Sequence, residues 1–243
     1  MNTSRRNFIK KTATAAAGIG LVGTANAMSA KSYRNIIGAN DRINIAIQGL
    51  GRRYSGFIDG IATKENNVHL QYLCDVMPSQ LEKAQLKVGE KIDYKIKSEA
   101  DIRNIIDDKK IDAIFMATPD HWHTPGAIMA MQAGKHVYLE KPCSHNPFEN
   151  ELVVAAQKKY KKVVQMGNQQ RSSLESQEII SDIHKGIIGD VYKAVAFYTN
   201  RRGKVPVPVK ATPPKGLDWD LFQGPSPRKE YTHDTWNYNW HWY

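Results

Sequence analysis

The side chains best suited to chemistry lie in two short stretches, residues 118–125 and 134–142, which read TPDHWHTP and GKHVYLEKP. Lys141 stands out because an amine can take the proton of a hydroxyl group while a hydride leaves the same carbon for an acceptor. Its ordinary pKa of about 10.4 would have to fall through burial and a neighbouring positive charge. The alternative is that Glu140 and Lys141 form an ordinary charge pair at a strand end.

The segment before residue 118 indicates where in the fold these side chains would lie. Residues 111–117 form an apolar run that predicts a buried parallel strand, so residues 118–125 are expected to form the loop at its C-terminal end. Ligands bind at such ends in open α/β sheets. Lys141 follows another predicted strand, residues 136–139, and Pro142 could fix the turn there through a cis bond.

Two glycines follow the first predicted strand, residues 43–48. Gly49 suits a tight turn, and Gly51 lets the backbone approach a pyrophosphate at a helix N-terminus. Tyr54 occupies the place of the third glycine of a dinucleotide fingerprint and should push the helix away slightly. A purely structural turn is the alternative, but a strand before the glycines and an acid after them favour dinucleotide binding.

That acid is Asp75, which ends the second predicted strand, residues 68–74. Its carboxylate would accept hydrogen bonds from the adenosine ribose hydroxyls, which favours NAD over NADP. NADP stays possible as the cofactor, because the guanidinium of Arg52 or Arg53 could bind its 2′-phosphate.

A metal site is the other chemistry to consider, because His121 and His123 lie close together. Alternate residues on a loop supply only two ligands, and no carboxylate or cysteine joins them at a usable spacing. We therefore predict that no metal is bound.

The fold follows from apolar segments that alternate with polar, helix-forming ones, which predicts a parallel sheet. Strands are expected at residues 43–48, 68–74, 111–117, 136–139 and 163–166, and helices at 79–88, 100–106, 125–133 and 148–160. The sequence thus predicts an α/β fold: a doubly wound parallel (Rossmann) domain over residues 43–167.

Residues 168–243 are expected to begin a second domain that is incomplete in this chain, since they cannot enclose a core of normal size. A helix is predicted at 172–185, a strand at 191–198 and a Pro-rich loop at 205–214. Trp236, Tyr238, Trp240 and Trp242 recur with period two, which predicts a strand with one aromatic face. We expect these rings to pack against a sheet or subunit rather than to stack on sugars.

The N-terminus resembles a twin-arginine signal peptide over residues 1–27, followed by a linker over residues 28–42. Arg5 and Arg6 precede a weakly apolar Ala/Gly stretch and a small-residue cleavage site; a basic helix of the mature protein is the alternative. This stretch is too weakly apolar for a stable membrane span. We expect export to the periplasm or outer cell surface, where a nicotinamide enzyme would have to retain its cofactor.

The net charge and the cysteine count limit the possible binding partners and disulfides. The net charge of +10 includes four basic residues of the leader, Arg5, Arg6, Lys10 and Lys11, so +10 − 4 = +6 remains, and it is scattered. We therefore expect no nucleic-acid binding. Cys74 and Cys143 would lie about 14 Å apart, with two strands between them, so we expect two free thiols.

Several motifs together resemble the Gfo/Idh/MocA oxidoreductase family from residue 43 onward. They are Thr118-Pro119-Asp120-His121-Trp122-His123, Gly134-Lys135-His136-Val137, Glu140-Lys141-Pro142, Gly167-Asn168-Gln169-Gln170-Arg171 and Gly216-Leu217-Asp218-Trp219-Asp220-Leu221. The resemblance implies a second α/β domain with a mostly antiparallel sheet, which carries substrate contacts and often a dimer interface. A homo-oligomer of the full-length protein is expected on this basis.

The resemblance also implies roles for single residues. Lys141 would act in catalysis and touch substrate, and Arg171 would touch substrate. The cofactor would be bound by the glycine turn, by Asp75 and by residues beside the nicotinamide half, with His123 near its ribose: Gly49, Gly51, Arg52, Arg53, Asp75, Thr118, Pro119, Asp120, His121, Trp122, His123, Glu140, Lys141, Asn168 and Gln169. A second acid/base residue would lie beyond Tyr243.

The leading hypothesis is an exported NAD(P)-dependent oxidoreductase that acts on a carbohydrate or polyol hydroxyl with tightly bound cofactor. One alternative is a glycoside hydrolase of the same superfamily that uses NAD to oxidise and re-reduce the sugar around an elimination step. That branch shares the Trp-x-His pattern but usually lacks a lysine after the glutamate, so Lys141 argues against it. The other alternative is a non-catalytic nucleotide- or sugar-binding protein, which the altered third glycine would permit.

Overall fold

The computed structural model of the chain describes residues 42–199 and 207–233, together with Trp236 and Trp240. The predicted signal peptide and all of the predicted linker except Arg42 lie outside these residues, as does most of the predicted aromatic strand at 236–242. Within the described part of the chain, no helix is both long and apolar enough to cross a membrane.

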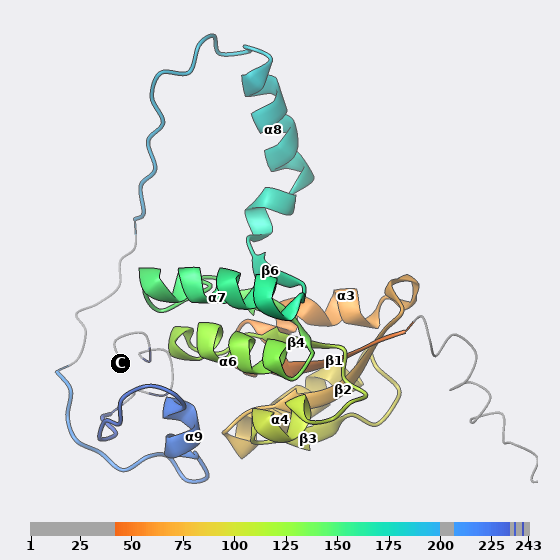
Figure 1. Ribbon diagram of the computed structural model, residues 1–243, viewed down its shortest axis with the longest axis vertical. Coiled ribbons are helices and arrows are strands. Elements are labelled where there is room, and N and C mark those ends of the chain that lie inside the picture. Colours follow the sequence, from red (N-terminus) through yellow and green to blue (C-terminus); the bar gives the residue numbers. More distant parts are fainter. Residues whose placement is uncertain (1–41, 200–206, 234–235, 237–239, 241–243) are drawn as a thin grey trace, which may run out of the picture. The chain divides into compact units, whose positions relative to one another are not determined.

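Six parallel strands form one sheet in the order β3-β2-β1-β4-β5-β6 (Figure 1). Their bounds are Ile43–Gln48 (β1), Val68–Cys74 (β2), Lys97–Glu99 (β3), Ala113–Met116 (β4), His136–Glu140 (β5) and Val164–Gly167 (β6). The chain reverses its direction of travel across the sheet between β1 and β4, which is where doubly wound folds bind ligands. The predicted doubly wound, Rossmann-like α/β fold is thus confirmed.

Helices cover both faces of this sheet, because strand side chains alternate between them. Ile45 and Ile47 of β1 pack in one buried cluster with η1, α3 and α4, whereas Ala46 packs in a second cluster with α5, α6 and α7. The helical bounds are Tyr54–Phe57 (η1), Ile58–Ala62 (α3), Lys64–Asn66 (η2), Pro78–Gly89 (α4), Ile102–Ile106 (α5), Asp120–Gln132 (α6), Pro147–Tyr160 (α7), Gln169–Ser172 (η3), Leu174–His184 (α8) and Trp219–Gln223 (α9).

The predicted loop at residues 118–125 is mostly helix, which corrects the sequence prediction. Helix α6 begins at Asp120, and Pro125, which looked like a helix start, lies inside it. The Trp122 amide donates to the Pro119 carbonyl at 3.0 Å, so the first turn closes on the earlier proline. Asp120 adds a negative charge in that turn, where the helix dipole favours it. Only Ala117, Thr118 and Pro119 connect β4 to α6.

The sequence analysis missed β3, because it is a three-residue edge strand of sequence KSE without the apolar run that marks buried strands. It pairs with β2 and supplies Glu99, whose carbonyl accepts from the Asp75 amide at 3.1 Å. This strand therefore helps to fix the end of β2.

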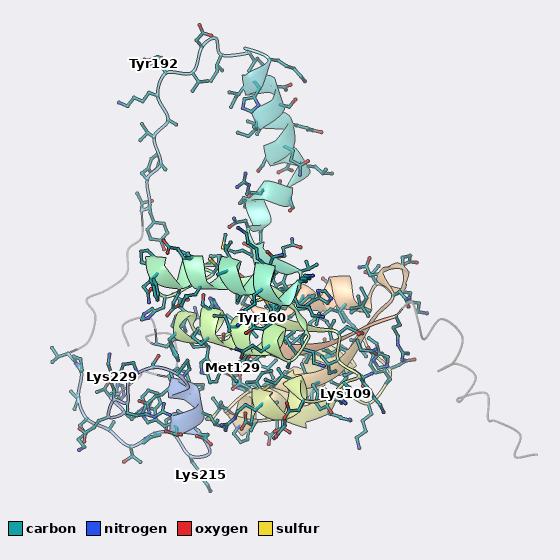
Figure 2. The ribbon with its side chains drawn as sticks, viewed as in Figure 1. Lys109, Met129, Tyr160, Tyr192, Lys215 and Lys229 are labelled. Atoms are coloured by element: carbon teal, nitrogen blue, oxygen red, sulfur yellow. The ribbon has the colours of Figure 1, made fainter. Side chains whose placement is uncertain are left out.

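The strand predicted at residues 191–198 is wrong, since residues 191–199 form no strand and are exposed. Tyr192, for example, is 97% exposed (Figure 2). Aromatic and β-branched residues favour a strand only where a neighbouring strand packs against them. In the described part of residues 168–243, sheet pairing is limited to one antiparallel bridge between Lys210 and Thr232.

Two of the terminal tryptophans are described, and both pack within the chain, whereas the sequence analysis expected them to pack against a sheet or a subunit. Trp236 and Trp240 lie against a small buried cluster made by Met77, Leu217, Phe222 and Tyr231. Trp236 lies in a turn rather than in a strand. Cys74 and Cys143 are both free thiols, as predicted.

Candidate functional site

A cavity of about 700 Å³ opens at the carboxyl ends of β1, β2, β4 and β5. Its volume is in the range of small-molecule sites. Most of the residues predicted to bind a cofactor line it: Gly49, Gly51, Arg52, Arg53, Asp75, Thr118, Pro119, Asp120, Trp122, His123, Glu140 and Lys141. His121, Asn168, Gln169 and Arg171 do not line the cavity.

The glycine turn after β1 lines the cavity with Gly49 and Gly51. Gly49 has φ +86°, and a Cβ there would lie 2.7 Å from backbone atoms of Ala117 and Thr118, so only glycine fits. A Cβ on Gly51, in contrast, would meet no atom within 4 Å. The backbone at Gly51 therefore borders open space that a phosphate group could approach.

Asp75 holds the glycine turn in place. Its Oδ2 accepts from the Leu50 amide at 2.7 Å, and its Oδ1 accepts from the Met77 amide at 2.9 Å. Burial raises the pKa of this carboxyl, and the two amide bonds oppose that shift. Each carboxylate oxygen has a second lone pair, so the predicted ribose contact stays possible alongside this structural role.

Glu140, at the end of β5, is the most connected side chain of the site. It is 4% exposed, and its Oε1 accepts from Arg53 Nε at 2.6 Å. Gln169 Nε2 lies 3.0 and 3.2 Å from its two carboxylate oxygens. The hydrogen bond to Glu140 raises the pKa of Arg53. Arg53 is thus committed to Glu140, which weakens the prediction that it meets a 2′-phosphate.

Lys141 lines the cavity, and the residue is exposed. The described residues of the chain therefore do not bury the Lys141 amine, although a lowered pKa would require such burial. The Lys141–Pro142 peptide is cis, as Pro142 suggested.

His123 connects the two chemical stretches instead of pointing a free nitrogen at a ribose. Its Nε2 lies 2.9 Å from the Thr118 carbonyl, and its Nδ1 contacts the Pro142 carbonyl. The ring is 1% exposed, and burial lowers its pKa. A neutral imidazole carries one N–H, so it donates to one of these carbonyls at a time.

His121 and Trp122 contact the backbone of α9, which the sequence analysis did not predict, and Trp122 also lines the cavity. His121 Nε2 lies 2.8 Å from the Phe222 carbonyl. Trp122 Nε1 donates to the same carbonyl at 2.9 Å and to that of Leu221 at 3.1 Å. Among the described residues, no three His, Cys, Asp or Glu side chains are grouped so that they could hold a metal ion.

Asn168, Gln169 and Arg171 are exposed at the end of β6. Gln169 reaches the site through Glu140, whereas Asn168 and Arg171 lie outside the cavity lining.

The sequence analysis missed the cavity residues that follow α8, which are Leu221, Phe222, Trp236 and Trp240. The motif at residues 216–221 marked this segment without indicating a function. It also missed Gln48, a polar residue that ends an apolar strand and lines the cavity.

Two buried atoms at the cavity fit a polar ligand. Gln48 Oε1 and Thr118 Oγ1 have no hydrogen-bond partner among the described residues. Buried polar atoms rarely stay unpaired in a folded protein, because the lost hydrogen bond is costly. Together with the open backbone at Gly51, they show that the residues present fit a dinucleotide with hydroxyl and phosphate groups.

Comparison with known proteins agrees with this geometry. A family described as "Oxidoreductase family, NAD-binding Rossmann fold" matches residues 43–168. A curated relative from Saccharopolyspora erythraea, named "Glycosyl hydrolase family 109 protein", is 28% identical over 211 residues, which cover 80% of this chain and 45% of the relative. One from Solibacter usitatus with the same name is 26% identical, covering 82% and 46%. The chain thus spans about half the length of these relatives.

Two solved structures are similar. The WlbA dehydrogenase from Bordetella pertussis, in complex with NADH and UDP-GlcNAcA, is 26% identical with a TM-score of 0.54, covering 60% of this chain and 42% of that one. The scyllo-inositol dehydrogenase from Lactobacillus casei, with NAD(H) and scyllo-inositol, is 28% identical with a TM-score of 0.54, covering 61% and 43%.

The predicted cofactor, NAD, is thus confirmed as the cofactor of the matched family and of these neighbours. The matched residues, 43–168, make up more than half of the 243 residues and include the glycine turn, Asp75, Glu140 and Lys141. The chain therefore belongs to the Gfo/Idh/MocA oxidoreductase family.

Proposed function

We propose that this chain is part of an NAD-dependent oxidoreductase that acts on a hydroxyl group of a carbohydrate or polyol. The observation that supports this most is the continuous cavity from Asp75 at the end of β2, across the glycine turn, to Lys141 after β5. Such a cavity suits an extended dinucleotide with its reactive end at the lysine. Asp75, which borders the cavity, and Arg53, which is held by Glu140, favour NAD over NADP, whereas Arg52, which also lines the cavity, leaves NADP possible.

Lys141 is the proposed catalytic residue. Its Nζ takes the proton of the substrate hydroxyl, and bound NAD supplies the acceptor for the hydride that leaves the same carbon. Because the Lys141 side chain is exposed in the chain alone, bound cofactor and substrate have to provide its desolvation. Arg53 and Gln169 hydrogen-bond the carboxylate of the adjacent Glu140 and so help to position the end of β5, which Lys141 follows.

Replacing Lys141 tests this assignment. Lys141→Met should lower hydride transfer by about 100-fold or more, the usual loss for a general base. NAD binding should be retained, since the glycine turn and Asp75 are untouched. The assay is NADH formation with a panel of sugars and polyols. Lys158→Met on α7, at an exposed position away from the cavity, is the control. Turnover that survives Lys141→Met would contradict the assignment.

The second candidate function is NAD-dependent glycoside hydrolysis, which the names of the curated relatives favour. In that reaction the sugar would be oxidised, would lose its aglycone, would add water and would be reduced again. Bound NAD would supply the hydride acceptor and then the hydride donor, so the net reaction would consume only water. A panel of chromogenic glycosides separates the two functions. A hydrolase releases the aglycone with no net change in nicotinamide absorbance, whereas an oxidoreductase accumulates NADH without cleaving the glycoside.

Export by the twin-arginine route to the periplasm or outer cell surface is also proposed, supported by Arg5 and Arg6 before the apolar stretch. An exported enzyme then has to carry its cofactor with it. Cofactor retention is tested by denaturing the purified protein and identifying the released nucleotide as NAD or NADP. Release of neither nucleotide would favour the non-catalytic alternative. We also propose that the full-length protein forms a homo-oligomer, and light scattering would measure its mass in solution.

A further inference from the structure

The outer wall of the cavity comes from residues outside the family match at 43–168. Leu221 and Phe222 of α9 line it, together with Trp236 and Trp240. We infer that residues 216–231, here named the α9 segment, belong to the cofactor site and retain the cofactor by closing over it. This inference rests on the proposed binding of NAD and adds the element that would prevent its escape.

The first anchor of the α9 segment is at the start of α6. His121 Nε2 and Trp122 Nε1 both point at the Phe222 carbonyl, at 2.8 and 2.9 Å, and Trp122 also reaches the Leu221 carbonyl. A carbonyl only accepts, so Nε2 of His121 carries the proton. His121 is 5% exposed and Trp122 9%. Water therefore has little access to replace these bonds.

The second anchor follows β2. The Asp218 amide donates to the Val76 carbonyl at 3.2 Å. Met77, which comes next, packs in a buried cluster with Leu217, Phe222 and Tyr231. Because β1 lies between β2 and β4 in the sheet, a segment anchored after both of those strands crosses the glycine turn that follows β1.

The α9 segment is ordered by its own contacts. Asp218 Oδ1 caps the helix by accepting from the Leu221 amide at 2.9 Å. Trp219 stacks on Phe222 with 5.1 Å between ring centroids. Gly224 has φ +52°, and a Cβ there would overlap the Trp122 indole, so the close packing requires glycine.

A dinucleotide bound at the glycine turn would thus lie beneath a segment held on both sides. Release of the cofactor then requires one anchor to open. Weakening an anchor should raise the dissociation rate of NADH about tenfold, the effect of one buried hydrogen bond. The association rate should not fall, because opening also admits the cofactor.

The unmodified full chain provides the first test, by limited trypsin digestion with and without saturating NAD. Cleavage after Arg228 and Lys229, inside the α9 segment, should slow when NAD is bound. Cleavage after Lys109, an exposed lysine that does not line the cavity, is the internal control for a general gain in stability (Figure 2). Equal slowing at all three residues, or none, with NAD shown to be bound, would overturn the inference.

Two variants provide the second test. His121→Phe removes one anchor bond, and Gly224→Ala wedges the segment away from Trp122; neither residue lines the cavity. Gly60→Ala on α3, where a Cβ meets nothing within 4 Å, is the matched control. NADH release is followed by fluorescence during a chase with excess NAD. Unchanged release from folded variants would overturn the inference, and if the variants do not fold, the digestion of the unmodified chain decides. If the unmodified chain binds no nucleotide, the proposed function itself fails.

Discussion

Gly49→Ala should destabilise the chain strongly, because two separate costs meet at this glycine. Its φ of +86° would force alanine into a left-handed conformation, which costs about 1–2 kcal/mol. The new Cβ would also lie 2.7 Å from backbone atoms of Ala117 and Thr118. Backbone cannot rotate away as a flexible side chain can, so we expect a further cost of about 1–3 kcal/mol, as for overpacked cores.

The two costs together lower the free energy of unfolding by about 2–5 kcal/mol, against a typical total of about 5–15 kcal/mol. The protein should still fold, with a melting temperature lowered by about 4–20 °C. Because Thr118 lines the cavity, NAD affinity should fall as well.

Urea denaturation of the full chain, followed by circular dichroism, measures the effect. Gly60→Ala is again the matched control: it adds the same methyl group to a helix with no atom within 4 Å and should stabilise by up to about 1 kcal/mol. Equal urea midpoints for Gly49→Ala and Gly60→Ala would mean that Gly49 has neither the positive φ nor the close contact with Ala117 and Thr118 on which the prediction depends.

Two further predictions concern other parts of the site. Gly167→Ala should destabilise by about 1–3 kcal/mol, because its Cβ would overlap the Tyr138 hydroxyl and lie 3.0 Å from Glu140 Oε1; a melting temperature equal to that of the parent would contradict this. Burial lowers the pKa values of His121 and His123 below 6.5, so the unfolded chain binds protons at a higher pH than the folded chain. Stability should therefore decrease as pH falls below about 6.5, and His121→Phe should show a smaller decrease between pH 7.5 and 5.5 in urea titrations.

Much of the fold could be predicted because its signals are local. Buried parallel strands are rich in apolar residues, and β1 and β2, which are mostly apolar, were predicted with the bounds that the structure shows. β3 lacked that signal, because a short polar edge strand is defined only by its partner. The start of α6 was misplaced because Pro119 and Pro125 both precede helix-forming residues, and only the turn geometry distinguishes them.

Some residues of the candidate site could likewise be predicted from the sequence, and others could not. Its cavity-lining glycines, Asp75 and Lys141 were recognised from their positions at strand ends. The roles of His121 and Trp122 could not be, since their partner, Phe222, is about a hundred residues further along the chain. Hydrogen bonds between such distant residues leave no periodic pattern in a sequence.

By itself, then, the sequence determined the doubly wound sheet and predicted the edge at which a dinucleotide would bind, because apolar periodicity and turn residues act over a few positions. Its short motifs indicated the family by resemblance. Only the tertiary structure decided which polar side chains face the cavity and which hold other segments in place. Arg53 donates a hydrogen bond to Glu140. His123 contacts the carbonyls of Thr118 and Pro142. His121 contacts the Phe222 carbonyl of α9. The physical reason is that a buried donor or acceptor must find a partner, and which partner lies within reach depends on how the chain packs.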